Sequence, residues 1–385
     1  MLNISEDFTF DALVTDGAQR VALELTRCLG IEGLKVLVVE KKDCKNTCLA
    51  AKSFFCNKSA TITDYESSEF YDLCLRSRTI FPVSTNTILA VMREAPPEII
   101  SKCLLPSNET FKKANGKASI IEISEKAGVG FPETRLYSHD NMPEPRNIRL
   151  PAVLKLLDDE GLFLEPVQRY EIVRSEDETK KAWSKLASFG KDIVVQDYIE
   201  GAAYGWSALY GRDGKMLAGI GHLRLREYPI SGGPSTYCES VKDEQLENAG
   251  RKMLDYIGWT GPAMVEFKLD KNDGKFKILE INPRYWGSLP LARFAGLNLP
   301  FLHYQIIAGK EITPLKEYRV SVKLKFQAID LLAALKEFVG TTNKTSYLIK
   351  YFLECLNFKI KDGIWSWKDP KPGFYYLLDR IEFKR

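Results

Sequence analysis

The sequence predicts an α/β protein with several domains and a helical C-terminal extension. Three observations predict this class. The 385 residues are too many for one small core. Residues 11–40 read as strand, turn, helix and strand, and residues 151–200 alternate strands with helices again. Hydrophobic residues make up 45% of the chain and charged residues 27%, which is ordinary globular composition and fits buried sheets covered by helices.

Residues 1–105 carry the pattern of a parallel α/β domain. The apolar run DALVTD, the helically spaced AQRVALELTRCLG and the strand LKVLVVE form a βαβ unit, and RTIFPVSTNTILAVMRE repeats strand, turn and helix. Asp16-Gly17 ends the first strand as in nucleotide-binding folds, but GxGxxG is absent, so a structural turn is favoured over a dinucleotide site. We therefore expect a Rossmann-like domain that ends in a proline-rich linker near residue 105.

Residues 106–195 and 196–310 are expected to form a small and a large subdomain. In the first, NGKASIIEISEKAG is a helix closed by Gly128, PAVLKLL is a strand, and DETKKAWSKLASFG is an amphipathic helix closed by Gly190. In the second, YGWSALYG and KMLAGIGHLRLREY read as antiparallel strands around the turn RDG. The turn sequence KNDG joins two further strands, GPAMVEFKLD and KFKILEINPR, into a hairpin.

Composition argues against several classes of function. The formal net charge of +3 gives no strong attraction to nucleic acid, and no apolar run is long enough to span a bilayer. The N-terminus MLNISEDFTF lacks the apolar core of a secretory signal, so a cytoplasmic location is expected. Cys44, Cys48 and Cys56 lie close together, but no second couple with matching histidines follows, and reduced thiols are favoured over a metal site or disulfide.

The strongest chemical signal lies on the last two strands of the large subdomain. Glu266 stands in MVEFKLD, and Glu280 and Asn282 stand in LEINPR. Positions two apart on a strand point to the same face, and the hairpin brings Glu266 alongside. Two carboxylates and an amide oxygen suit Mg²⁺ that also holds ATP phosphates. Arg284 falls on the same face, where it would stabilise charge on a transferring phosphoryl group. Taken alone, the pattern E-x-N-P-R lies on a solvated strand face about as often as in a metal site. The presence of Glu266 in an apolar setting on the preceding strand favours the metal site.

With these motifs in this order, residues 105–310 resemble the ATP-grasp superfamily, and specifically its carboxylate–amine ligase branch. The tail NPRYWGSLPLARFAGLNLP is similar to that of a "predicted carboligase" group within it. The resemblance implies an ATP-grasp fold and an enzyme that uses ATP and Mg²⁺, with Mn²⁺ as an alternative metal. Such enzymes activate a small-molecule carboxylate as an acyl phosphate and join it to an amine. Because many relatives are dimers, the resemblance also implies a homodimer.

The resemblance assigns roles to single residues. Lys117 and Lys155 match the two nucleotide lysines, although a lone lysine is more often a surface residue. QDYIEG matches the hinge that reads the adenine, through Gln196, Asp197, Tyr198 and Ile199. Glu266, Glu280 and Asn282 match the metal ligands, and Arg284 matches the transfer-stabilising arginine. The chain departs from the family after Lys155, where LLDDEGLFLEPVQRYEIV holds only Gly161 in place of a glycine-rich loop, so the phosphate cradle is expected to be built differently.

The substrate is expected near GHLRLREYPISGGPSTYCESV, where relatives bind the acyl or acceptor group. Arg224 and Arg226 alternate on a strand, so both are expected on one face, where either suits a substrate carboxylate. A surface hairpin with solvated arginines is an equally weighted alternative. Gly287 and Ser288, just past the metal strand, are further candidates for the acyl site.

The sequence leaves two alternative functions open, and it does not decide what residues 311–385 contact. A biotin-carboxylase-like enzyme would use bicarbonate, but the chain is short and has no biotin-carrier lysine motif. A nucleotide-binding regulatory or scaffold protein with a degenerate ATP-grasp site is favoured slightly by the missing glycines, but the intact Glu266, Glu280, Asn282 and Arg284 argue against it. Residues 311–385 are basic and aromatic with amphipathic helices, so contact with a membrane surface or a partner is open, and packing against the core is favoured.

Overall fold

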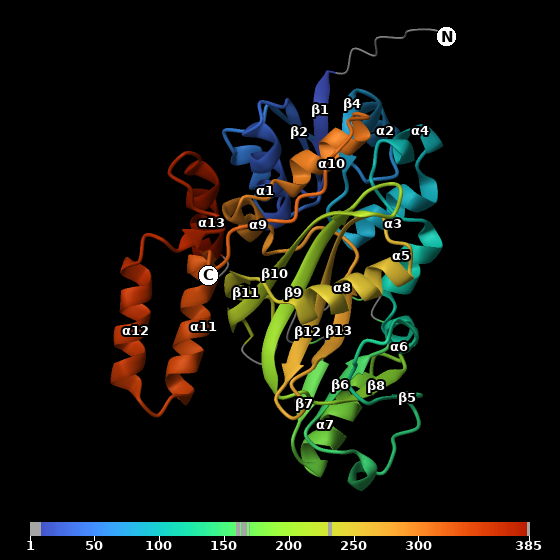
Figure 1. The fold of residues 1–385 in the computed structure, drawn as a ribbon, viewed down its shortest axis with the longest axis vertical. Helices are drawn as coiled ribbons and strands as arrows, with labels where there is room; N and C mark the ends of the chain where they lie inside the picture. Colours follow the sequence, from blue (N-terminus) through green and yellow to red (C-terminus); the bar gives the residue numbers. More distant parts are fainter. Residues whose placement is uncertain (1–8, 159–161, 163–167, 169, 230–232, 383–385) are drawn as a thin grey trace.

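The computed structural model describes residues 9–158, 162, 168, 170–229 and 233–382. Within these residues the chain forms three sheets, one of seven strands and two of four. Figure 1 shows them one after another along the long axis, with the N-terminal sheet at the top and the smaller mixed lobe at the bottom. The α/β class expected from the sequence is confirmed.

The N-terminal sheet is parallel, as the βαβ pattern predicts. Its strand order is β3-β2-β1-β4, with β1 paired to both β2 and β4. The strands are β1 (Phe10–Val14), β2 (Val36–Lys41), β3 (Lys58–Ile62) and β4 (Ser77–Phe81), and the helices are α1 (Arg20–Gly30), α2 (Ser68–Leu75), α3 (Thr85–Glu94) and α4 (Pro97–Ser101), with a short 3-10 turn η1 (Ala50–Lys52). Asp16, after β1, accepts hydrogen bonds from the Ser84 amide at 3.1 Å and the Thr87 hydroxyl at 3.0 Å. Asp16 therefore joins the ends of β1 and β4, which is a structural role.

The central sheet carries the two hairpins expected for residues 201–282. Its order is β13-β12-β9-β10-β11-β14-β15, antiparallel except for the last pair. The strands are β9 (Gly201–Tyr210), β10 (Met216–Glu227), β11 (Ser235–Val241), β12 (Gly261–Asp270), β13 (Phe276–Asn282), β14 (Lys323–Lys325) and β15 (Lys361–Asp362). Gly214 and Gly274 take positive φ angles of 72° and 66° in the two turns. A residue with a Cβ is strained there, which is why the turns RDG and KNDG end in glycine.

Both faces of the central sheet are covered. On one face lie α5 (Asn108–Asn115), α6 (Lys117–Ala127) and α8 (Glu244–Tyr256), whose Phe111, Ile120 and Leu246 pack in one apolar core with Trp206 and Val265 of the sheet. On the other face, α9 (Leu289–Ala295) and α10 (Leu299–Ile307) join the core shared with α1. The central sheet is thus fixed from both sides, and its strands hold side chains at defined positions.

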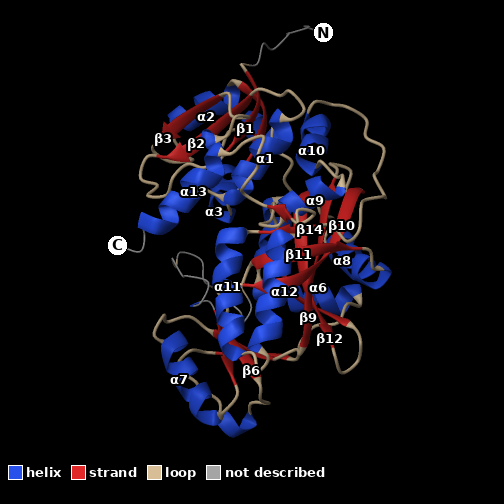
Figure 2. Ribbon diagram, turned by 90° about the vertical axis from the view of Figure 1, so that its left-hand side faces the viewer, coloured by secondary structure: helices blue, strands red, loops and turns tan. Residues whose placement is uncertain are grey.

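The small lobe is an antiparallel sheet with one helix. Its order is β5-β8-β6-β7, from β5 (Thr134–Tyr137), β6 (Ala152–Leu156), β7 (Tyr170–Val173) and β8 (Ile193–Asp197), with a 3-10 turn η2 (Pro145–Asn147). Ala152, Leu154 and Leu156 are buried in one core with Trp183 and Leu186 of α7 (Glu176–Ala187). Figure 2 shows α7 on the outside of this lobe. Because side chains alternate along a strand, the intervening residues of β6 face away from α7.

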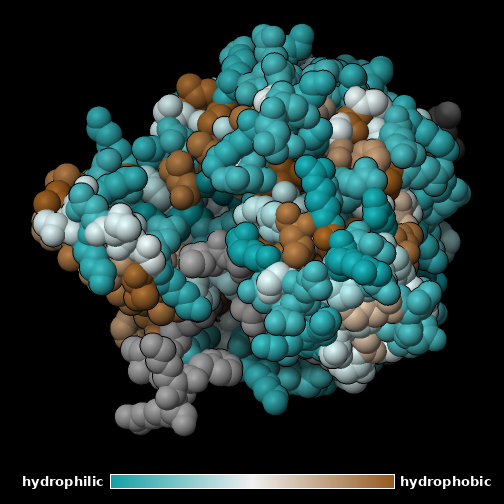
Figure 3. Space-filling view, turned by 90° about the horizontal axis from the view of Figure 1, so that it is seen from below, coloured by the Kyte–Doolittle hydropathy of each residue, from teal (hydrophilic) through white to brown (hydrophobic). Residues whose placement is uncertain are grey.

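The C-terminal extension is only partly packed on the core. It comprises α11 (Gln327–Gly340), α12 (Lys344–Leu356) and α13 (Lys371–Glu382) besides β14 and β15, which add to the central sheet. The favoured expectation of core packing therefore holds for the strands and the inner side of α11. On α12 no residue is buried, and only one side of the helix, with Tyr351 and Glu354, contacts Arg226 and Lys325 of the core. Figures 1 and 3 show the α11–α12 hairpin standing off the body, with apolar side chains on its surface.

Packing also departs from the expected ranges 106–195 and 311–385. Helices α5 and α6 belong by contact to the central sheet, against β13 and α8, and not to the small lobe. The strands β14 and β15 pair into that same sheet from the C-terminal range. The fourfold division into 1–105, 106–195, 196–310 and 311–385 stays a prediction about folding units.

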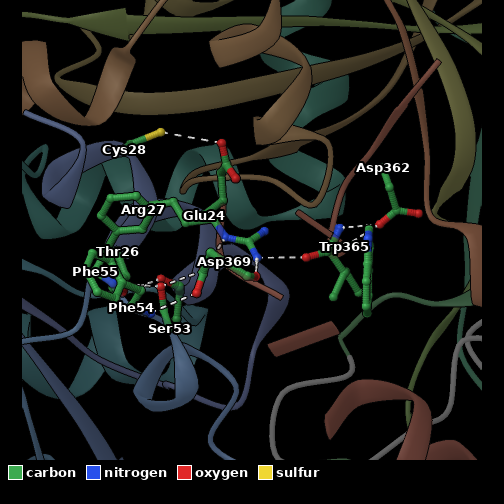
Figure 4. Close-up of polar contacts among 12 residues, drawn as sticks. Glu24, Thr26, Arg27, Cys28, Ser53, Phe54, Phe55, Asp362, Trp365 and Asp369 are labelled. Atoms are coloured by element: carbon green, nitrogen blue, oxygen red, sulfur yellow. Dashed lines mark hydrogen bonds and ion pairs between the residues drawn. The ribbon is translucent and has the colours of Figure 1, made fainter. Parts of the chain in front are cut away.

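A buried ion pair fixes the end of the extension on the N-terminal domain (Figure 4). The Arg27 guanidinium donates from Nε to Asp369 at 2.8 Å and from Nη2 to the Ile364 carbonyl at 2.8 Å. The Ser53 hydroxyl and the Phe54 amide donate to the same carboxylate at 2.7 and 2.8 Å. Each charge is hydrogen-bonded, which a buried pair requires to be tolerated. The extension therefore links the first and last parts of the chain.

His303 on α10 gives the fold a predicted sensitivity to acid. Its ring lies 4.3 Å from that of Phe81, and burial lowers the pKa of His303 from 6.5 to about 3. In the unfolded chain the imidazole takes up a proton as the pH falls below 6.5, whereas in the fold it stays neutral down to about pH 3. Stability is therefore lost as the pH falls through that window, by about 1.4 kcal/mol per pH unit, or about 2 kcal/mol between pH 6.5 and 5.

Denaturant unfolding of the wild type and His303→Gln, at about pH 7 and about pH 5, measures this effect. Acidification is expected to cost the variant about 2 kcal/mol less than the wild type. His139→Gln is the control, because the His139 side chain is 38% exposed, and it should behave as the wild type does. An equal loss in wild type and His303→Gln would show that His303 does not carry this acid sensitivity.

Candidate active site

A cleft of about 400 Å³ lies between the small lobe and the central sheet. Its walls come from α1, α6, β6, β7, β10, β12, β13 and the segment after β13. It brings together most of the residues singled out in the sequence, namely Lys117, Lys155, Arg224, Glu266, Glu280, Asn282, Arg284, Gly287 and Ser288. Segments separated by more than a hundred positions thus meet in one cleft.

The two carboxylates and the amide are in contact with one another. Glu266 on β12 lies directly opposite Glu280 on β13, and Asn282 lies two positions further along β13. The Asn282 Nδ2 atom is 3.0 Å from an oxygen of Glu266 and 3.0 Å from an oxygen of Glu280. Burial raises the pKa of Glu266, and the adjacent Arg224 guanidinium, in an ion pair with it, opposes that rise. Strand alternation and hairpin pairing therefore assemble this cluster as the sequence predicts.

The cluster fits a hard divalent cation in its chemistry. Two carboxylates and an amide oxygen are the ligands that Mg²⁺ prefers. Among the described residues, no three His, Cys, Asp or Glu side chains are placed so that they could hold a metal ion together, and the candidate set here combines two carboxylates with the Asn282 amide. In the structure the Nδ2 atom of Asn282 faces the two carboxylates, and its Oδ1 atom accepts a hydrogen bond from the Arg284 guanidinium at 3.2 Å. Ligation by Asn282 therefore requires a half-turn of its amide, whose two orientations are nearly isosteric.

Positive side chains from three elements face these carboxylates. Arg284, after β13, donates to the Thr85 hydroxyl at 3.3 Å and so bridges to the start of α3. Lys117, the first residue of α6, donates to the Leu156 carbonyl of the small lobe at 2.7 Å. Lys155 lies on the face of β6 that is turned away from α7 and lines the cleft. Cations around a carboxylate cluster are the complement of a metal-bound polyphosphate.

The hinge residues Gln196 and Asp197 point in opposite directions. Pairing of β6 with β8 puts Gln196 on the same sheet face as Lys155, and its amide donates to the Thr134 hydroxyl at 2.9 Å. Asp197 alternates to the α7 side and pairs with Arg149 at 3.2 Å, in a separate hollow. The Asp197 side chain therefore does not line the cleft.

The main chain of the hinge is already partly hydrogen-bonded. The Asp197 amide donates to the Glu133 carbonyl at 2.9 Å, and the Tyr198 amide donates to the Pro151 carbonyl at 3.1 Å. These two donors hold the hinge on the small lobe and are not available to an adenine. If the backbone after Gln196 binds the adenine, the groups that stay available for it are the backbone carbonyls of this segment and the backbone of Ile199.

Arg226 does not lie in the cleft, contrary to expectation. The pairing of β10 with β11 shifts register between Arg224 and Arg226, so the two side chains do not share a face. Arg224 enters the cleft, whereas Arg226 contacts Asp330 at 2.7 Å, Glu337 at 3.1 Å and Glu354 at 3.2 Å. The alternative of a solvated hairpin also fails for Arg226, whose side chain is 6% exposed. Its role is to hold the C-terminal extension, which the bulge makes possible.

Several cleft residues were given no site role from the sequence, among them Arg20 and His222. Arg20 begins α1, and its guanidinium lies 4.3 Å from the ring centre of Phe326. A cation in the first turn opposes the helix dipole, and that turn holds no acid, which was a readable signal for an anion-binding role. His222 lines the cleft beside Gly205, and burial lowers its pKa to about 3, so it is neutral. Nothing in the sequence distinguished it from an ordinary strand residue.

The loop expected to line the substrate end does so where it is described. Gly233, Pro234 and Ser235 line the cleft together with Trp286, which is otherwise buried. Ser231 and Gly232 lie outside the described residues, and so does Gly161 in the glycine-poor stretch after Lys155. The departure from the glycine-rich pattern therefore stays a sequence observation.

A family model described as "ATP-grasp in the biosynthetic pathway with Ter operon" matches residues 190–328. An alignment 207 positions long, which covers 49% of this chain and 9% of the relative, is 28% identical to acetyl-CoA carboxylase of Saccharomyces cerevisiae. A stretch of 206 residues is 23% identical to D-aspartate ligase of Enterococcus faecium, over 49% of this chain and 48% of that protein. The chain thus spans at most about half the length of these relatives.

A solved structure extends the likeness to most of the chain. L-amino acid ligase from Bacillus licheniformis superposes with a TM-score of 0.59 over 82% of this chain and 80% of that one, at 15% identity. At that identity the likeness establishes the fold alone. Together with the family match, it identifies the arrangement of small lobe and central sheet as the ATP-grasp fold.

Proposed function

We propose that the chain is an ATP-grasp enzyme, an ATP- and Mg²⁺-dependent ligase that joins a carboxylate to an amine. The family match over residues 190–328 and the shared fold support this proposal. One observation carries the proposal. The carboxylates of Glu266 and Glu280 converge in a single cleft with the cations of Lys117, Lys155 and Arg284. The similarity to D-aspartate ligase supports the amine as acceptor.

The proposed nucleotide site has its phosphates between the small lobe and β12–β13. Mg²⁺, held by Glu266, Glu280 and a turned Asn282, would neutralise the phosphate charge and orient the triphosphate. Lys117 and Lys155 approach from α6 and β6, so they bind phosphate oxygens from the side opposite the carboxylates. Gln196 lies on the same face as Lys155, which suits a role at the adenine end.

The chemistry follows from the poor leaving group of a free carboxylate. A carboxylate oxygen of the substrate attacks the γ-phosphorus, the bond to the ADP oxygen breaks, and an acyl phosphate forms. Arg284 would stabilise the charge that spreads over the transferring phosphoryl group. An amine then attacks the acyl carbon, loses a proton and expels phosphate. The chain supplies positions and a water-poor cleft, and no side-chain nucleophile is required.

Arg224 changes partner in this proposal. It pairs with Glu266 and, at 3.7 Å, with Glu227. If Glu266 holds a divalent ion, its charge would be shared with that ion, and the Arg224 guanidinium would be able to bind a substrate carboxylate at the same end of the cleft. Arg20, on the opposite wall, is a second candidate for the same substrate group.

The finer parts of the proposal concern location and assembly. We place the enzyme in the cytoplasm as a homodimer that acts on small molecules. All eight cysteines are free thiols, which fits a reducing compartment. Among the described residues, no helix has the length and apolarity needed to cross a bilayer.

A second candidate function is carboxylation of the biotin-carboxylase type. The similarity to acetyl-CoA carboxylase favours it, because such a ligase would activate bicarbonate in the same cleft. ADP release that requires bicarbonate and no other carboxylate would select this function. Tight ATP binding without turnover on any carboxylate would select the regulatory or scaffold alternative.

A phosphate-release screen over libraries of carboxylates and amines, with MgATP, tests the proposal. The wild type is expected to release phosphate only with a matching pair. Glu280→Gln should lower that turnover by about 100-fold or more, because it removes one charged metal ligand. Glu317→Gln is the matched control, since the Glu317 side chain is 82% exposed and lies outside the cleft, and should be fully active. Unchanged substrate-dependent turnover in Glu280→Gln would refute the metal assignment.

A further inference from the structure

The α11–α12 hairpin and the segment after it expose large apolar side chains. Phe352 is 63% exposed, Leu353 60%, Phe358 92% and Trp367 87%. The other members of this exposed set are Leu331, Leu335, Val339, Leu348, Ile349 and Leu356. On α12 they recur at helical spacing beside the core-facing Tyr347, Tyr351 and Glu354. We call residues 327–372 with these side chains the apolar hairpin face.

The apolar area is too large to be incidental. The ten large apolar side chains of this set are each at least 48% exposed, whereas exposed apolar residues on an ordinary monomer are scattered singly. Figure 3 shows brown side chains gathered on the projecting left-hand part of the molecule, interspersed with polar ones. An occupant is therefore required.

Charge is segregated between the two sides of residues 327–372. All seven lysines of this range are exposed, namely Lys336, Lys344, Lys350, Lys359, Lys361, Lys368 and Lys371. All five acidic side chains are hydrogen-bonded inward, namely Asp330, Glu337, Glu354, Asp362 and Asp369. Two of the five, Asp362 and Asp369, are visible at the base of the extension in Figure 4. The outer surface is thus apolar, aromatic and positively charged.

We propose that the apolar hairpin face docks on the surface of an anionic lipid membrane. Lysines among aromatic and aliphatic side chains complement both the headgroup charge and the acyl boundary. Trp365 and Trp367 pack edge to face, with their ring centres 5.7 Å apart. Their amphipathic rings favour a membrane interface. The hairpin would lie in the interface, since the 13 residues of α12 reach only about 20 Å and cannot cross a bilayer.

The charge of the apolar hairpin face favours an anionic membrane over a second copy of the chain as its binding partner. A symmetric dimer through this face would bring seven lysines against seven others, with the acids of both copies already paired inward. The hairpin of α11 and α12 also projects from the body (Figure 1), so it can reach a flat surface such as a membrane. The inference does not rest on the ligase assignment.

Vesicle co-sedimentation of the full chain tests the proposal. The probes are phosphatidylcholine vesicles with and without about 30% phosphatidylserine, at about 0.1 M and about 0.5 M NaCl. Binding is expected with phosphatidylserine only, and it should weaken at high salt. Lys344→Glu/Lys350→Glu and Phe352→Ser/Leu353→Ser should each lower the bound fraction about tenfold or more.

Two double variants outside the extension serve as matched controls. Lys112→Glu/Lys252→Glu makes the same charge change on α5 and α8, and Leu75→Ser/Tyr256→Ser removes exposed apolar groups elsewhere. Both should bind vesicles as the wild type does, and all variants should keep the wild-type melting temperature. Salt-independent binding, loss of binding in the controls, or no vesicle binding at all would overturn the proposal. Dimerisation that the hairpin variants abolish, without vesicle binding, would assign the face to a second copy.

Discussion

Replacing Arg284 by methionine is expected to lower kcat by about 10³-fold and to change the dissociation constant of ATP by no more than about threefold. The guanidinium is positioned by the Thr85 hydroxyl, the Asn282 amide oxygen and the Tyr285 carbonyl, at 3.2–3.3 Å. In the transition state the negative charge is spread over the oxygens of the transferring phosphoryl group, so a cation fixed for that geometry acts mainly on the rate. Methionine keeps much of the aliphatic volume and removes the charge.

Steady-state phosphate release and equilibrium ATP binding separate the two effects. Arg284→Lys keeps the charge without the planar fork, so its kcat should fall between those of Arg284→Met and the wild type. Arg149→Met is the control, because the Arg149 side chain is 84% exposed and lies outside the cleft. A variant Arg284→Met with normal kcat and a raised KM for ATP would show that Arg284 binds the ground-state nucleotide only.

The carboxylate cluster was predictable because it depends on local rules. Glu280 and Asn282 share a face through strand alternation, and the short KNDG turn makes β12 and β13 neighbours. The exact pairing of Glu266 with Glu280 also depends on a register shift between Glu266 and Phe267, which the sequence did not predict. The βαβ unit, its parallel sheet and the left-handed Gly128 that ends α6 followed from equally local patterns.

What the sequence did not reveal depends on irregular or long-range contacts. The β-bulge on β10 sends Arg226 away from Arg224, and regular alternation cannot anticipate an extra residue. Arg20 enters the cleft because the N-terminal domain packs against the central sheet. Apolar spacing on α12 indicated an amphipathic helix but not which surface would cover it, and in the folded chain its apolar side is exposed.

Replacing Asp330 by alanine is expected to lower the free energy of unfolding by about 3–5 kcal/mol. Asp330 is fully buried in the first turns of α11 and accepts hydrogen bonds from Arg226 and from the Thr236 hydroxyl at 3.0 Å. The Lys325 ammonium lies 3.5 Å away and is 1% exposed. Without Asp330, two buried cations share only Glu354 and the more exposed Glu337, and an uncompensated buried charge is costly.

Denaturant unfolding measures this loss, and two variants calibrate it. Glu317→Ala removes an exposed ion pair with Lys242 in the same extension and should cost about 1 kcal/mol or less. Asp330→Asn keeps the hydrogen-bonding shape without the charge, so its cost should lie between the two. A cost for Asp330→Ala as small as that for Glu317→Ala would mean that Arg226 and Lys325 are not held by this carboxylate. In that event α11 must be attached mainly by its apolar contacts and by the Glu337–Arg226 pair, because Asp330 is the side chain through which α11 reaches both cations.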